Sequence, residues 1–209
     1  MDTTQNKMKK AYYLLIIMLM IGTTVIAQDK GSEVMLGTEH PAYQQSSDTT
    51  KCFVFGEYVV KTSQPEGEGD DISIYRRVSS NNPKNECKTK GKPYLLIKDS
   101  DNNSFFGIAK NFLFVDSGTS VESRGLAVYN LASRRSVVTE GYTENIKLVG
   151  DRFVIYDTPS EKRGLIKACK EAAKWKREGG GVGWVQGMKL DLQTLTRTKI
   201  GGLRCVYME

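Results

Sequence analysis

Short apolar runs separated by polar turns dominate the chain from residue 51 onward. The runs are rich in Val, Ile, Phe and Tyr, and Gly, Asn, Asp and Ser separate them. Examples are CFVFGEYVVKT (52–62), DISIYRRV (71–78), NFLFVD (111–116), GLAVYNL (125–131), RFVIYD (152–157) and LRCVYM (203–208). Runs of this kind with hairpin-length connections are typical of antiparallel sheets. The pattern therefore predicts a single all-β domain over residues 51–209.

Three stretches of this domain share one pattern. They span residues 56–80, 110–133 and, with an interruption, 150–160 and 187–194. Each opens with an aromatic-led β run that ends near Lys61, Asp116 or Asp157, and each returns through a second run after a polar loop. Two copies end in Asn/Asp-Leu-x-Ser/Thr, at residues 130–133 and 191–194, where the Asx side chain can cap its own backbone in a tight turn. We interpret the stretches as repeated hairpins, although any β meander can produce similar ones.

The repeat spacing narrows the choice of architecture. The copies start 54 and 40 residues apart, which is about the period of β-propeller blades. The stretch VYNLAS (128–133) resembles the blade turn of WD-type repeats over these few residues only, and the WD and GH signatures are absent. Three copies are too few for a closed propeller, which takes at least about four blades. We therefore expect a sandwich, a barrel or an open set of propeller-like blades.

A helical segment interrupts the third copy. Apolar residues recur there at helical spacing, at Leu165, Ile166, Cys169, Ala172 and Ala173. Three glycines, Gly179 to Gly181, end the pattern. The spacing predicts one short inserted helix over about residues 161–178.

Basic residues on this helix form the candidate binding surface. They are Lys170, Lys174, Lys176 and Arg177, with Trp175 and Trp184 nearby. Cations beside aromatic rings suit an anionic glycan, a lipid headgroup or an acidic protein, and the expected partners are an anionic glycan or another protein of the cell envelope. The alternative is an ordinary solvated helix face, relieved by neighbouring glutamates.

The N-terminus has the features of a signal peptide. Lysines precede an apolar run at residues 11–22, which is shorter than the ~20 residues that span a bilayer. Val25 and Ala27 are the small residues that signal peptidase requires. We predict a signal peptide at residues 1–27, cleavage after Ala27 and a secreted or periplasmic protein without a membrane span; the alternative is a membrane anchor. Residues 28–50 are polar and without periodicity, which predicts a disordered leader.

The cysteines predict disulfides rather than a metal site. They number four, Cys52, Cys87, Cys169 and Cys205. An even number in an exported chain favours disulfide bonds. Of the three possible pairings we prefer Cys52–Cys87 and Cys169–Cys205, because each closes a short loop within one part of the chain. The spacings are too wide for a metal or redox motif, so no metal and no cofactor are expected.

The charge pattern and the types of residue present argue against some classes of function. The formal net charge is +6 with the two signs interspersed, unlike the basic stripe of a nucleic-acid-binding protein. The only histidine, His40, lies in the polar leader, so Ser-His-Asp or Cys-His catalysis has no base. We therefore expect no catalytic residues, and a non-catalytic binding or structural protein of the cell envelope.

Two other functions stay open. A polysaccharide hydrolase would use a pair of carboxylates near strand ends. The candidates are Glu57, Asp70, Asp71, Asp116 and Asp157. A secreted enzyme inhibitor is the second alternative. The oligomeric state is left open by the sequence.

Overall fold

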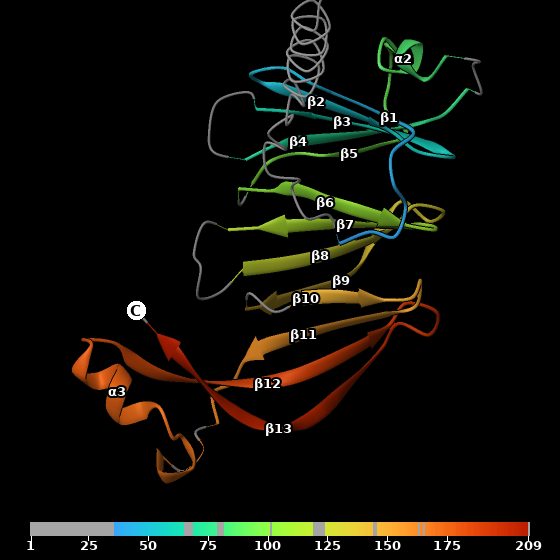
Figure 1. Cartoon of the computed structure of the whole chain (residues 1–209). Coiled ribbons are helices and arrows are strands. Elements are labelled where there is room, and N and C mark those ends of the chain that lie inside the picture. The colour runs from blue at the N-terminus through green and yellow to red at the C-terminus, as the bar shows by residue number, and fades with distance from the viewer. Residues whose placement is uncertain are drawn as a thin grey trace, which may run out of the picture. The chain divides into compact units, whose positions relative to one another are not determined.

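Three antiparallel sheets follow one another along the chain (Figure 1). The computed structural model describes residues 36–64, 69–78, 82–100, 102–118, 124–143, 146–162, 164 and 166–208. The predicted signal peptide and its cleavage after Ala27 lie outside the described residues.

Each sheet is an up-and-down arrangement in which strands adjacent in sequence pair with each other. The first sheet comprises β1 (Tyr43–Ser46), β2 (Thr50–Val54), β3 (Tyr58–Ser63), β4 (Asp71–Arg76) and β5 (Leu95–Ile97). The middle sheet comprises β6 (Ser104–Ala109), β7 (Phe112–Ser117), β8 (Arg124–Asn130) and β9 (Arg135–Tyr142). The third sheet comprises β10 (Ile146–Val149), β11 (Phe153–Pro159), β12 (Gly181–Asp191) and β13 (Thr196–Met208). The described helices are short, namely α2 (Pro83–Glu86), the 3-10 turn η1 (Ile166–Ala168) and α3 (Ala172–Arg177).

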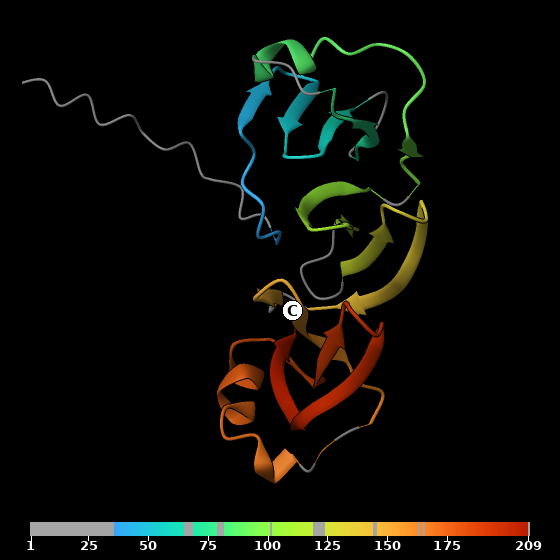
Figure 2. The ribbon, with the colours of Figure 1, turned by 90° about the vertical axis from the view of Figure 1, so that its right-hand side faces the viewer.

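The predicted repeats correspond to the central hairpins of the three sheets. These hairpins are β3–β4, β7–β8 and β11–β12, each an antiparallel pair. The all-β prediction is confirmed, and the described strands form open, blade-like sheets rather than a closed barrel. Figure 2 shows the same succession of sheets after a quarter turn.

The middle sheet is buried on both faces, because its strands are apolar at successive positions. Leu113 and Val115 belong to the core shared with the first sheet, whereas Phe114 between them belongs to the core shared with the third. All three side chains are at most 1% exposed. Side chains alternate across a strand, so this continuous apolar run fills two cores at once.

Two buried aspartates end equivalent strands in the middle and third sheets. Asp116, at the end of β7, accepts hydrogen bonds from Arg124 Nε at 2.9 Å and from Tyr142 Oη at 2.8 Å. Asp157, in β11, forms an ion pair with Arg204. Burying a carboxylate is costly unless it is paired and hydrogen-bonded. The partners of these two aspartates therefore offset the cost of burying their charges near the ends of the two strands.

The fold begins earlier than the predicted start at residue 51. Leu36 is buried in the core between the middle and third sheets, and its N–H donates to Phe106 O at 2.6 Å. A Cβ on Gly37 would lie 2.1 Å from Ile108 O, so only glycine fits this close approach. Strand β1 then pairs with β2. Residues 36–50 are thus part of the β domain, and the predicted leader is wrong for them; β1 lacks apolar alternation because it is an exposed edge strand.

The inserted segment is less helical than predicted. In place of one helix over residues 161–178, the described part contains the turn η1 and the six-residue α3. Gly164 packs against the ring of Trp184, where a Cβ would lie 2.4 Å from the ring. This part of the segment is therefore placed by its contact with Trp184. Gly179, with φ at +86°, lies just past the end of α3 as expected. No described helix is long and apolar enough to cross a bilayer.

Both preferred disulfides are confirmed. Cys52 and Cys87 are joined across a Cα–Cα distance of 6.0 Å, and Cys169 and Cys205 across 5.8 Å. The first bond ties the α2 segment to β2, and the second ties the insertion to β13. There is no free cysteine among the described residues.

We expect Phe114→Ala to destabilise the protein strongly. The fully buried ring lies in the core shared by the middle and third sheets, and removing such a ring costs about 3–5 kcal/mol. Urea denaturation measures the free energy of unfolding. The matched control is Leu195→Ala, at a side chain 38% exposed, which should change it by less than about 0.5 kcal/mol. Equal losses for the two variants would contradict burial of the middle sheet on both faces.

A second prediction concerns alkaline pH. Burial, together with the hydrogen bond to Asp116, raises the pKa of Tyr142 above its usual value of 10.0. The unfolded chain releases this proton first, so the free energy of unfolding should fall as pH rises above about 10. Tyr142→Phe should lower stability at neutral pH and reduce that alkaline slope, measured by urea denaturation from about pH 8 to about pH 11. An unchanged slope would show that this hydroxyl is not buried in the folded state.

Candidate functional site

A basic pocket lies on the outer face of the first sheet, between the strands and α2. We call it the sheet–α2 pocket, and its volume is about 460 Å³. It is lined by Gln45, Ser47, Thr50, Lys51, Cys52, Lys61, Thr62, Ser63, Ser73, Tyr75, Lys84, Cys87 and Lys88. Its lining contains four lysines and several hydroxyl groups, and none of the described lining residues is an aspartate or glutamate.

Strand register explains why polar side chains gather on this face. Lys61 of β3 lies opposite Cys52 of β2 and opposite Ser73 of β4, so the three residues form one row across the sheet. Residues directly opposite each other point to the same face. The neighbouring row, which includes Val60 and Ile74, points into the core shared with the middle sheet. The row of Lys61 and Ser73 therefore faces away from the core, as expected where side chains alternate between the two faces of a strand.

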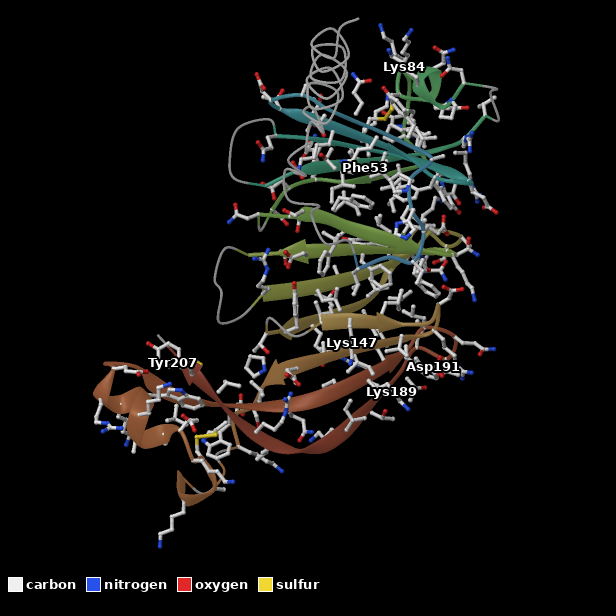
Figure 3. The ribbon with its side chains drawn as sticks, in the orientation of Figure 1. Phe53, Lys84, Lys147, Lys189, Asp191 and Tyr207 are labelled. Carbon is white, nitrogen blue, oxygen red and sulfur yellow. A yellow bond between two sulfur atoms is a disulfide. The ribbon has the colours of Figure 1, made fainter. Side chains whose placement is uncertain are left out.

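The other wall of the pocket is the α2 segment. Asn82 caps this short helix by accepting a hydrogen bond from Lys84 N at 3.0 Å, and Pro83 occupies its first turn. The Cys52–Cys87 disulfide holds the end of the segment against β2. Lys84 and Lys88 thereby line the pocket from the side opposite the strands, and Figure 3 shows Lys84 beside α2.

Lys61 is the most enclosed lysine of the pocket. Its Nζ donates to Thr89 O and lies 5.1 Å from the centroid of the Tyr75 ring. Burial lowers the pKa of Lys61 below its usual value. The nearest helix carboxylate, Glu86, is turned toward Arg77 at 3.8 Å and is not among the lining residues. An entering anion would therefore meet lysine side chains in a lining whose described residues include no aspartate or glutamate.

The predicted basic helix face is exposed, but its aromatic component is not. Lys170, Lys174, Lys176 and Arg177 are all exposed to solvent. Trp184 is buried against Cys169 and Ala172, and Trp175 packs edge-on against Tyr207 with ring centroids 6.2 Å apart. Trp184 therefore packs the insertion against the sheet. The exposed lysines and the arginine form a charged surface to which Trp184 does not contribute.

The strand-end carboxylates do not share a pocket lining. They are distributed over the three sheets, with Glu57 and Asp71 in or beside the first, Asp116 in the middle and Asp157 in the third. Each of these four has a cationic partner. Glu57 pairs with Arg76 at 3.4 Å, and Asp71 pairs with Lys98 at 2.7 Å. Asp116 pairs with Arg124, and Asp157 pairs with Arg204. The backbone N–H of Asp70 donates to Asn103 O at 2.6 Å. Within the described ranges, no three His, Cys, Asp or Glu side chains are grouped so that they could hold a metal ion.

The sequence alone points to a different lysine cluster from the one that forms the pocket. Lys61, Lys84 and Lys88 are scattered along 28 residues, and no linear motif joins them. A usable signal does exist, since Lys61 and Ser73 are the polar members of otherwise apolar β runs. Only the strand register and the disulfide bring them to one place.

Comparison of the chain with protein-family models, with curated proteins and with solved structures gives no match. The function is therefore inferred from the chemistry of the site itself. That site is a lysine-lined, hydroxyl-rich pocket held by a disulfide on the outer face of a β-sheet.

Proposed function

We propose that this protein is a secreted, non-catalytic binding protein of the cell envelope whose sheet–α2 pocket binds an anionic oligosaccharide. One observation carries the proposal: four lysines line the pocket, and the described part of the lining includes no aspartate or glutamate. A lining whose charged side chains are all positive attracts anions and increases their local concentration.

The polar groups of the pocket suit a sugar better than a compact inorganic anion. Gln45, Ser47, Thr50, Ser63 and Ser73 provide amide and hydroxyl groups that can both donate and accept hydrogen bonds. A saccharide bears many hydroxyl groups and, when sulfated or carboxylated, charges that the lysines can bind. Lysine ammonium groups act as mobile point charges and do not require one fixed anion geometry.

Binding is also better supported than hydrolysis. Hydrolysis of a glycosidic bond needs two carboxyl groups that flank the scissile bond, about 5–9.5 Å apart. The carboxyl candidates Asp116 and Asp157 belong to different sheets, and each is buried and ion-paired. Neither carboxyl group therefore faces the other across a shared site where a glycosidic bond could lie.

Charge reversal in the pocket tests the proposal. We expect Lys84→Glu/Lys88→Glu to weaken the binding of a heparin-derived sulfated oligosaccharide at least tenfold, because two of the four cations become anions. Isothermal titration at two salt concentrations measures the affinity, and the wild-type affinity should fall as salt rises.

The matched control reverses two charges of α3, in Lys174→Glu/Lys176→Glu. The net charge changes by the same amount, yet binding should fall no more than about twofold, by long-range electrostatics alone. If the α3 variant lost binding while the pocket variant kept it, the exposed basic face of α3 would be the binding surface and the pocket proposal would be wrong.

A further prediction concerns the Cys52–Cys87 disulfide. Replacing both cysteines by serine frees α2 from β2, so the two α2 lysines lose their fixed position and the affinity for the same oligosaccharide should fall several-fold. The stability loss, about 3–4 kcal/mol for a loop of this length, is measured separately by urea denaturation. The Cys169→Ser/Cys205→Ser variant controls for general destabilisation and should keep the affinity. Equal affinities for all three proteins would contradict the role of α2.

A further inference from the structure

A second basic groove lies where the first and middle sheets meet, separate from the sheet–α2 pocket. Its volume is about 470 Å³. Cationic residues on its rim are Lys92, Arg134 and Arg135, and its apolar part includes Leu95 and Leu96. None of its described lining residues is a carboxylate, and none of these three cations forms an ion pair with a described carboxylate.

The Tyr94 ring contacts Arg134 of this groove and also Arg76, which lies outside the groove lining. The guanidinium carbon of Arg76 lies 4.7 Å from the Tyr94 ring centroid, and that of Arg134 lies 5.4 Å from it. The Tyr94 hydroxyl donates to Leu131 O at 3.0 Å, which connects the segment before β5 to the β8–β9 turn. The groove is therefore built on contacts between two sheets and is preorganised to receive a ligand.

The sister turn of the third sheet shows that the fold does not require these arginines. In the β8–β9 turn, Asn130 Oδ1 accepts from Ser133 N at 3.0 Å and Arg134 has φ at +58°. In the β12–β13 turn, Asp191 Oδ1 accepts from Gln193 N at 2.9 Å, and the corresponding left-handed residue is Leu195 with φ at +55°. The two turns have the same design, but Leu195 and Thr196 stand where the first turn has Arg134 and Arg135.

The apolar part of the groove belongs to an edge strand. Strand β5 ends the first sheet and, among the described strands, pairs only with β4. Leu96 is 44% exposed, so this strand presents an apolar side chain to solvent. An exposed strand edge can accept an extended peptide through main-chain hydrogen bonds, with adjacent side-chain contacts providing specificity.

We propose that this groove binds an extended acidic segment of a partner protein. The segment lies along β5, places aliphatic side chains against the exposed Leu96, and directs the alternating carboxylates toward Arg134 and Arg135. Guanidinium forks match carboxylates in paired hydrogen bonds, and apolar side chains next to them favour a peptide over a sugar. This proposal is independent of the function of the sheet–α2 pocket.

The test uses a fluorescein-labelled peptide of alternating Glu and Val, with an alternating Lys and Val peptide as the charge control. Fluorescence anisotropy should show saturable binding of the acidic peptide to the full protein and none of the basic peptide. Arg134→Leu/Arg135→Thr, which copies the sister turn and so should fold, is expected to weaken binding at least tenfold. Leu96→Lys should weaken it as well, by removing the apolar contact.

Two control measurements separate this site from the pocket. Lys84→Glu/Lys88→Glu should bind the acidic peptide within about twofold of wild type, and Arg134→Leu/Arg135→Thr should keep its affinity for the heparin-derived oligosaccharide within the same range. Failure of the wild type to bind the acidic peptide would overturn the proposal, as would unchanged peptide binding by Arg134→Leu/Arg135→Thr. Loss of oligosaccharide but not peptide binding in that variant would assign the groove to glycan and also overturn it.

Discussion

Burial of the middle sheet on both faces is the constraint on which the other features depend. Strand β7 is apolar at successive positions, so it cannot present either face to water without exposing Leu113, Phe114 or Val115. A one-residue slip of its register would exchange the side chains of the two cores. The first and third sheets therefore each have one face committed to the middle sheet, so polar chemistry is left to their opposite faces and to the edges and turns where the sheets meet.

Both proposed sites follow from this division. The sheet–α2 pocket uses the opposite face of the first sheet, where the alternation places Lys61 and Ser73. The acidic-peptide groove uses the seam at which the first sheet meets the turns of the middle sheet. On the third sheet, Lys147 and Lys189 occupy the free face (Figure 3), and Lys189 lies 5.1 Å from the ring centroid of Phe153. On the first sheet, the α2 segment tied to β2 by the Cys52–Cys87 disulfide encloses the lysines in a pocket.

The features predictable from sequence were those encoded by local pattern. Repeated aromatic-led runs identified the three central hairpins, and loop length favoured the Cys52–Cys87 and Cys169–Cys205 bonds. Strand β1 escaped prediction because backbone pairing at an edge needs no apolar side chains. The helix over 161–178 was overestimated because helical spacing says nothing of Gly164 packing against Trp184. The pocket was missed because its lysines converge only through cross-strand register and a disulfide.

The central functional claim is that an anionic saccharide enters between the first sheet and α2. A crystal structure of the protein soaked with a sulfated disaccharide tests it most directly. The predicted result is a sulfate group within hydrogen-bonding distance of Lys84 or Lys88 and of a lysine on the strands, with sugar hydroxyls on the Ser and Thr side chains of the pocket. Disaccharide density on the exposed face of α3, with the sheet–α2 pocket empty at the same concentration, would contradict the account.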